Sequence, residues 1–191
     1  MNNRAKLTQA AIITAIGIVL CLGAAYIPFL GLLALILPVP YAIISTTSGY
    51  KYALISAISS FFILVLTVDV VYALNLLIMC MLPGIAVGYR INQDSKVEDE
   101  NKSFTPIYFG TIAFILSIIV FFAMSKLLFN IDLLADISKT IKATVEAQFA
   151  VMESTNMMPK ENITAKDMIN MFQNMMPTVL FMYSIIASLI T

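Results

Sequence analysis

The sequence contains no histidine, only two cysteines and few charged residues. Without histidine the chain has neither the commonest general base nor the usual zinc ligand, which excludes imidazole-based catalytic triads. Eleven basic side chains balance eleven acidic ones, so no large positive field would attract nucleic acid, and we expect no nucleic-acid partner. Cys21 and Cys80 fall within apolar stretches, which favours small buried residues over a disulfide.

Motifs for energy conversion and catalysis are also missing. The chain has no GxxxxGK[ST] phosphate loop, so any ATP hydrolysis would have to come from a partner. Catalysis within the membrane would need paired acids or an activated nucleophile, whereas the apolar stretches contain only isolated serines. We therefore predict no enzymatic activity, no catalytic residue, no metal site and no cofactor.

Apolar residues dominate the chain, at 60% of the sequence, with a mean hydropathy of +0.93. Residues 7–26 contain no charge and directly follow Arg4 and Lys6. At about 1.5 Å per residue this stretch can cross a hydrocarbon core of roughly 30 Å. A backbone in lipid must satisfy its own hydrogen bonds, so the stretch should be helical, and the basic pair predicts a cytoplasmic N-terminus.

The later apolar stretches predict an all-α, polytopic membrane protein that forms a single integral-membrane domain over residues 1–191. Residues 91–103 are polar and carry both charge signs, which predicts a cytoplasmic linker. The last stretch has only about 22 Å of helix after Pro177, so we expect a truncated final span and a longer natural chain. The predicted spans are residues 7–26, 29–48, 52–68, 70–89, 105–128 and 174–191.

Residues 130–152 differ from these spans, because apolar residues recur there every three or four positions between charged ones. That period predicts an amphipathic helix on the outer surface rather than a membrane span. A second, shorter helix should begin at Thr164, a good N-cap with Asp167 three residues later. Together they define a predicted extracytoplasmic helical insert over residues 129–175.

Small residues four positions apart indicate where helices could dock closely in lipid. The two clearest pairs are Ala11 with Ala15 and Gly84 with Gly88. Such spacing lets another helix approach, because apolar burial alone does not drive association within a bilayer. A single GxxxG pair is equally typical of general helix packing, so both interpretations stay open for the glycines.

Two places are candidates for ligand binding. Pro38 and Pro40 interrupt the second span and predict a short, kinked or partly unwound helix there, which makes residues 38–41 either a functional element or a purely architectural kink. Asp69, Tyr72 and Asn75 form a polar cluster at the outer end of the third and fourth spans. An ionisable residue at the membrane edge is a functional candidate, although a solvated loop acid is the simpler interpretation.

The order of features in residues 7–51 resembles the YybS family of bacterial membrane proteins. These features are LTQAAIITAIGIVL, then YIPFLG, then LPVPYAI, then a Gly-Tyr-Lys turn. The family is in turn similar to the S components of energy-coupling factor transporters. The resemblance implies a six-helix S-component-like core, a helix face at Ala11 and Ala15 that docks a coupling subunit with its ATPases, and an outer ligand site walled by Pro28 and Gly31.

Two functions follow as hypotheses. The first is a small-molecule-binding or transport subunit for an unknown small molecule, embedded in the lipid bilayer of the bacterial plasma membrane. The second is a membrane assembly or interaction protein of the cell envelope without transport activity, which would present its outer helices to another component. Flexible methionines suit such adaptable contacts, and eight of the twelve fall between Met152 and Met182.

Overall fold

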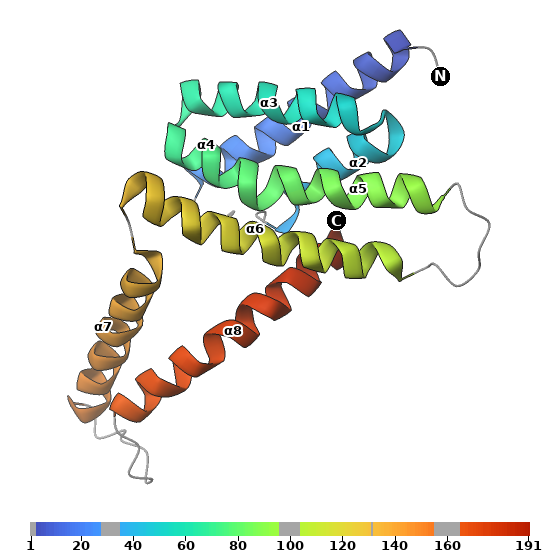
Figure 1. Cartoon of the computed structure of the whole chain (residues 1–191). Coiled ribbons are helices and arrows are strands. Elements are labelled where there is room, and N and C mark those ends of the chain that lie inside the picture. The colour runs from blue at the N-terminus through green and yellow to red at the C-terminus, as the bar shows by residue number, and fades with distance from the viewer. Residues whose placement is uncertain (1–2, 28–34, 96–103, 131, 155–164) are drawn as a thin grey trace. The chain divides into compact units, whose positions relative to one another are not determined.

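The computed structural model describes residues 3–27, 35–95, 104–130, 132–154 and 165–191 (Figure 1). The regular structure of these residues is helical throughout, and none of them lies in a strand. Two compact units are formed: unit 1 combines Met1–Phe121 with Tyr183–Thr191, and unit 2 is Phe122–Met182. The predicted all-α class is confirmed.

Five helices in the described part of the chain are long and apolar enough to cross a membrane. Large apolar side chains cover their outer surfaces; Val19 and Leu66, for example, are 67% and 85% exposed. Such surfaces are favourable when the surrounding solvent is hydrocarbon. The chain is therefore a polytopic membrane protein. The five stretches are Asn3–Tyr26, Tyr50–Thr67, Val70–Asp94, Thr105–Leu127 and Lys166–Ile190.

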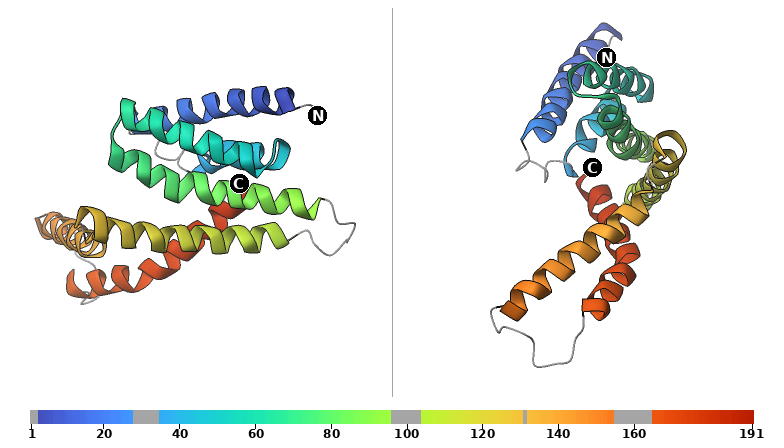
Figure 2. Two further views of the ribbon diagram at one scale, coloured as in Figure 1. Left: turned by 45° about the horizontal axis from the view of Figure 1, so that its top comes forward. Right: turned by 90° about the vertical axis from the view of Figure 1, so that its left-hand side faces the viewer.

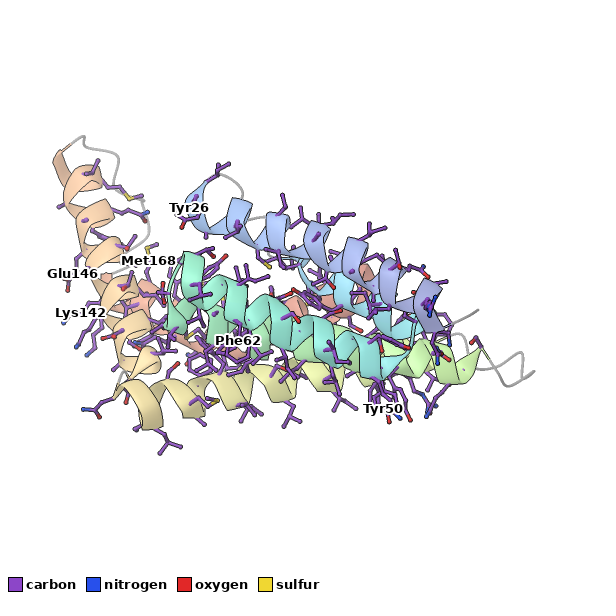
Figure 3. All side chains as sticks on the ribbon, turned by 90° about the horizontal axis from the view of Figure 1, so that it is seen from above. Tyr26, Tyr50, Phe62, Lys142, Glu146 and Met168 are labelled. Atoms are coloured by element: carbon purple, nitrogen blue, oxygen red, sulfur yellow. The ribbon has the colours of Figure 1, made fainter. Side chains whose placement is uncertain are left out.

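Helices α1 (Asn3–Tyr26) and α3 (Tyr50–Thr67) lie side by side and run in the same direction (Figure 2). At one end the Ser48 hydroxyl donates to the carbonyl oxygen of Lys6 over 3.3 Å. At the opposite end the Tyr26 hydroxyl donates to the carbonyl oxygen of Thr67. Figure 3 shows Tyr26 and Tyr50 at these opposite ends. We call the end of unit 1 that holds Arg4, Lys6 and Lys51 the basic end.

Helix α2 (Pro38–Thr47) is only ten residues long, or about 15 Å, and packs against α1, α3 and α5. Its N-cap, Leu37, has no capping side chain. Pro38 and Pro40 carry no N–H group, and the Val39 N–H donates to the carbonyl of Ile36 over 3.0 Å. The helix can therefore begin inside an apolar bundle, because none of its first three residues has an unpaired backbone N–H. The short helix that was one of the predicted alternatives is confirmed over residues 38–47, and residues 29–34 of the predicted span lie outside the described residues.

The fourth predicted span is a continuous helix of three segments, α4 (Val70–Leu76), the π-helical η2 (Leu77–Met81) and α5 (Leu82–Asp94). In η2 the Leu82 N–H donates to the carbonyl of Leu77, five residues back. Pro83 follows at once; it lacks an N–H, and its ring would clash with the carbonyl four residues earlier in a regular α-helix. The wider π turn accommodates the proline.

The same helix extends beyond its predicted end at residue 89. Residues 91–94 are helical, so the predicted linker over 91–103 begins too early. An ion pair between Arg90 and Asp94, 3.2 Å apart at i,i+4 spacing, favours this extra turn. Residues 96–103 lie outside the described part of the chain.

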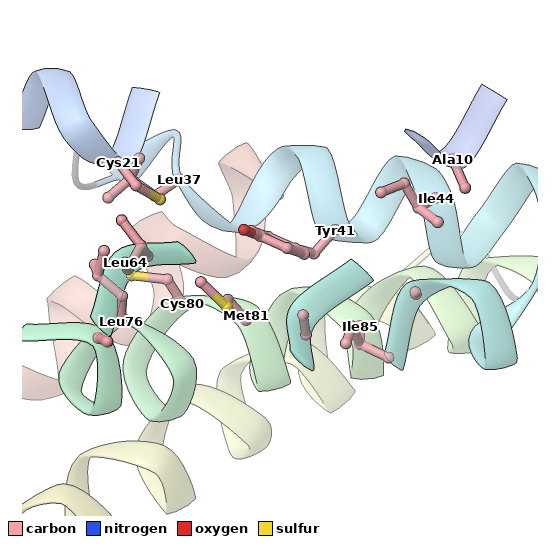
Figure 4. Packing of buried hydrophobic residues seen from close by; sticks show 13 residues of the cluster. Ala10, Cys21, Leu37, Tyr41, Ile44, Leu64, Leu76, Cys80, Met81 and Ile85 are labelled. Atoms are coloured by element: carbon pink, nitrogen blue, oxygen red, sulfur yellow. The ribbon is translucent and has the colours of Figure 1, made fainter. Parts of the chain in front are cut away.

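Helices α2 and α5 pack closely against each other in unit 1. A β-carbon added to Gly84 would overlap the carbonyl oxygen of Pro38, and one added to Gly88 would overlap that of Ala42. Two hydrogen bonds reinforce the contact: Ser45 Oγ donates to the carbonyl of Ile85 over 2.9 Å, and Asn92 Nδ2 to that of Thr46 over 2.6 Å. Figure 4 shows the core cluster that the neighbouring helices share, with Tyr41 at its centre.

Helix α6 (Thr105–Phe129) packs within unit 1 against the last two turns of α8 (Ala165–Ile190). Ser188 Oγ donates to the carbonyl of Ile107 over 2.8 Å, and Gly110 leaves the space that Ser188 fills. The sequence predicted a short amphipathic helix followed by a truncated span in this region. Instead one helix of 26 residues continues through Pro177, and its stretch Lys166–Ile190 is long enough to span. The prediction that this span is too short was therefore wrong.

Within unit 2, α7 (Leu133–Ser154) is the amphipathic helix predicted over residues 130–152. Val145 and Phe149 are buried on one face. Lys142 and Glu146, one turn apart on the exposed face, lie 3.9 Å from each other (Figure 3). The alternation of buried apolar and exposed charged positions follows the helical period of the sequence.

Candidate functional site

The predicted ligand-binding residues do not converge on one site in the described structure. Pro28 and Gly31 lie outside the described residues. Pro38 is fully buried, and its carbonyl oxygen forms the surface against which Gly84 packs. This proline therefore has an architectural role at the start of α2, and a ligand-binding role for it stays a prediction.

Asp69 and Tyr72 have defined structural partners. The Asp69 carboxylate caps α4 by accepting a 2.8 Å hydrogen bond from the backbone N–H of Tyr72. The Tyr72 hydroxyl donates to the carbonyl of Cys21 over 2.8 Å and so ties α4 to α1. Asn75 is half-buried, and its amide forms no hydrogen bond with a described residue. Of this cluster, the Asn75 amide and the second carboxylate oxygen of the exposed Asp69 stay available to another molecule.

The two predicted docking pairs have different surroundings. Gly84 and Gly88 are buried against α2, so within this chain they serve helix packing, which was the second interpretation of the GxxxG pair. Ala11 and Ala15 are exposed and line a groove of about 360 Å³ between α1 and α3. They are the pair that a further molecule can reach.

The α1–α3 groove is apolar apart from a few hydroxyl groups. Thr14 Oγ1 donates to the carbonyl of Ala10 over 2.6 Å, as threonine commonly does inside a helix. Ser56 and Ser59 of α3 also line the groove, and their hydroxyls form no hydrogen bond with a described residue. The remaining lining residues are Leu7, Ala10, Ala11, Ala15, Ile18, Tyr52, Ile55 and Ile63.

A buried polar cluster lies at the centre of the bundle. Tyr41 of α2 and Ser60 of α3 are both 0% exposed. The Tyr41 hydroxyl lies beside the Ser60 hydroxyl and the Cys21 thiol, yet neither hydroxyl has a hydrogen-bond partner of acceptable geometry among the described residues. Figure 4 shows the Tyr41 hydroxyl directed toward the part of the core that holds Cys21 and Cys80. These two hydroxyls are among the buried polar atoms that lack an accepted partner in the described part of the chain.

Local structure explains how Tyr41 reaches this position. Tyr41 lies in the first turn of α2, just after the two prolines that start the helix. Gly17 on α1 faces it, and a β-carbon there would lie 3.6 Å from the Tyr41 hydroxyl oxygen and 3.3 Å from Cβ of Pro40. The glycine thus lets α1 approach the start of α2. The sequence pointed to residues 38–41 through the prolines, but it gave no sign that Ser60 would face Tyr41.

A scan against family models places the chain among known sequences. A model described as "Predicted membrane protein (DUF2232)" matches residues 15–191. The chain belongs to this family. The match covers the described helices from α2 to α8, including the one that contains Tyr41, but only the second half of α1, so Ala11 lies outside it. No curated protein and no solved structure matches the chain.

Proposed function

We propose that this member of the family is a small-molecule-binding subunit of a membrane transport system. The observation that supports this most is the buried pair of hydroxyl groups on Tyr41 and Ser60. A polar group without a partner is costly inside a bundle that lipid surrounds, and such groups commonly mark ligand or ion sites. Both residues are 0% exposed, so a substrate with neutral hydrogen-bonding groups would reach these hydroxyls only after the surrounding helices move apart. The chain would bind this molecule rather than transform it.

Energy for transport would come from other subunits. The sequence has no phosphate loop, and its resemblance to the YybS family and to S components suggests a coupling subunit with ATPases as the partner. The exposed pair Ala11 and Ala15 is the proposed docking face, because small residues let a partner helix approach closely. Gly84 and Gly88 are already in contact with α2 and are left out of the proposal.

The proposed location is the bacterial plasma membrane, with the basic end in the cytoplasm. Arg4, Lys6, Lys51 and Arg90 all lie near this end of unit 1, which agrees with the excess of positive charge on cytoplasmic loops. A protease-cleavable tag before residue 1 tests the orientation. The tag should resist protease added to intact cells and become sensitive once the membrane is opened.

The binding proposal is tested on the full chain purified from its own membrane. Small molecules released by denaturation are identified by mass spectrometry and compared among the wild type, Tyr41→Phe, Ser60→Ala and the control Tyr108→Phe. Tyr108 is 70% exposed on α6, and its hydroxyl bonds no described residue. The Tyr41 and Ser60 variants should lose a molecule that the wild type and the control retain. Identical extracts from all four proteins would refute binding at this cluster.

A second function, a membrane assembly protein of the cell envelope, is favoured by α7. This helix carries exposed ion pairs and an apolar hollow lined by Ala143, Thr144, Ala147, Gln148, Val151 and Met152. Replacing residues 133–164 with a short flexible linker removes α7 but leaves the spanning part of α8 intact. A transport subunit should keep its bound molecule after this change, whereas an assembly protein should lose its partner in a pull-down from native membranes.

A further inference from the structure

The α1 wall of the groove between α1 and α3 ends in a cation. Leu7, Ala11 and Ala15 follow one another at intervals of four residues along this wall. Positions three or four apart share a helix face, so Arg4, three residues before Leu7, continues the wall by one turn toward the basic end.

The α3 wall has the same design. Ile55, Ser59 and Ile63 line it at intervals of four residues, and the next position back is Lys51. The two helices start side by side, as the hydrogen bond from Ser48 to the carbonyl of Lys6 demonstrates. Both walls of the groove therefore end in a basic residue at the same end of unit 1.

These cations are not neutralised by the elements that carry them. The sequence has no acidic residue before Asp69, which caps α4 at the far end of α3. Arg4, Lys6 and Lys51 form no ion pair with a described residue. Asp94, at the end of α5, is paired with Arg90. The mouth of the groove is thus positively charged and available to an anion.

Polarity inside the groove changes with depth. Ser56 is only 6% exposed, lines the groove and has no hydrogen-bond partner among the described residues. Ser56 lies five positions after Lys51, about 7.5 Å along the helix axis. Thr14 and Ser59 add hydroxyls slightly farther in, and the far end of the groove, at Ile18 and Ile63, is apolar. From the basic end inward the groove offers cations, then apolar side chains with a few hydroxyls among them, then an apolar end.

We propose that this groove binds one anionic phospholipid. The phosphate lies between Arg4 and Lys51, an ester carbonyl accepts a hydrogen bond from Ser56, and one acyl chain lies along Ala11 and Ala15. Basic pockets between membrane helices are typical sites for anionic headgroups. The lipid does not depend on the proposed transport function. It and a coupling subunit would compete for Ala11 and Ala15, so the two cannot occupy the groove at the same time.

Native mass spectrometry of the full chain tests the inference. The purified, delipidated protein is mixed with dioleoylphosphatidylglycerol or with zwitterionic dioleoylphosphatidylcholine, and the bound lipids are counted. The wild type should retain one phosphatidylglycerol in clear preference to phosphatidylcholine. Arg4→Gln and Lys51→Gln should each reduce this preference about fivefold. Lys166→Gln, which removes an exposed cation from the start of α8, should leave it unchanged.

A second pair of variants separates the apolar channel from the charged mouth. Ala15→Leu fills the groove and should abolish retention of both lipids. Val19→Leu, at an exposed position outside the groove, should retain them. Thermal unfolding of each variant verifies that it is folded. Equal retention of the two lipids by the wild type, or phosphatidylglycerol bound as before by folded Ala15→Leu, would overturn the proposal. So would a disulfide between two copies of Ala15→Cys, because it would place a second chain in the groove.

Discussion

The backbone of Gly84 touches the carbonyl oxygen of Pro38, so no side chain fits between α5 and the first residue of α2. One turn later Gly88 meets Ala42 in the same way. These two contacts fix the short helix α2 in place, and α2 in turn positions Tyr41 between α1 and α3. The architecture of the proposed ligand site therefore depends on two glycines that lie outside it.

Substituting these glycines should destabilise the fold. Gly84→Ala or Gly88→Ala would force α5 away from α2, and overpacking of this kind typically costs about 1–3 kcal/mol. Gly17→Ala is the milder comparison: its β-carbon would lie 3.3 Å from Cβ of Pro40, a tight contact that needs only a small shift, and alanine favours the helix. Thermal unfolding in detergent should show a smaller loss for Gly17→Ala than for the other two variants. Equal losses for all three variants would contradict the packing account.

The hydroxyl of Tyr72 should contribute measurably to stability. Tyr72→Phe removes the 2.8 Å hydrogen bond to the Cys21 carbonyl, and a loss of about 1 kcal/mol is expected for such a bond. The control Tyr108→Phe removes an exposed hydroxyl that bonds no described residue and should have no effect. Unfolding in mixed micelles with increasing sodium dodecyl sulfate measures the difference. A Tyr72→Phe protein as stable as the control would show that this bond between α4 and α1 adds nothing.

The π turn at Leu77–Met81 should be coupled to Pro83. Deleting Met79 returns this turn to the α-helical period, but it then sets the Pro83 ring against a carbonyl four residues earlier, at a cost of about 3 kcal/mol. Adding Pro83→Ala to the deletion should recover most of that loss. The four proteins of this double-mutant cycle are compared by thermal unfolding and by circular dichroism. If the effects of the two changes on stability were additive, the π turn would not depend on Pro83.

Two substitutions of Asp69 distinguish a role in capping α4 from a role in ligand binding. Asp69→Ala should cost about 1 kcal/mol, because the Tyr72 N–H loses its acceptor, whereas Asp69→Asn retains a side-chain oxygen for the cap. The unfolding temperature of Asp69→Ala should therefore be lower than those of the wild type and Asp69→Asn. If Asp69→Asn remains as stable as the wild type but loses the bound small molecule, the carboxylate charge takes part in ligand binding as predicted from the sequence.

Most of the helices could be predicted because their signals are local. Long uncharged runs gave α1, α3 and α6, and the three-to-four-residue apolar period gave α7. The prolines were harder to interpret. Pro38 predicted a short, kinked or partly unwound helix, and it starts the short helix α2, whereas Pro177 suggested a helix boundary and instead lies inside α8. Proline disfavours one backbone pattern, but its neighbours in space decide whether a helix begins or continues there.

The sequence by itself determined that this chain is a bundle of membrane helices, since hydropathy and periodicity are properties of consecutive residues. It also supplied the small residues on which close helix contacts depend. Only the tertiary structure decided that Gly84 and Gly88 face inward while Ala11 and Ala15 face outward, and that the hydroxyls of Tyr41 and Ser60 lie together. Residues on different helices meet according to how the helices pack, and packing is not encoded in the spacing along any one of them.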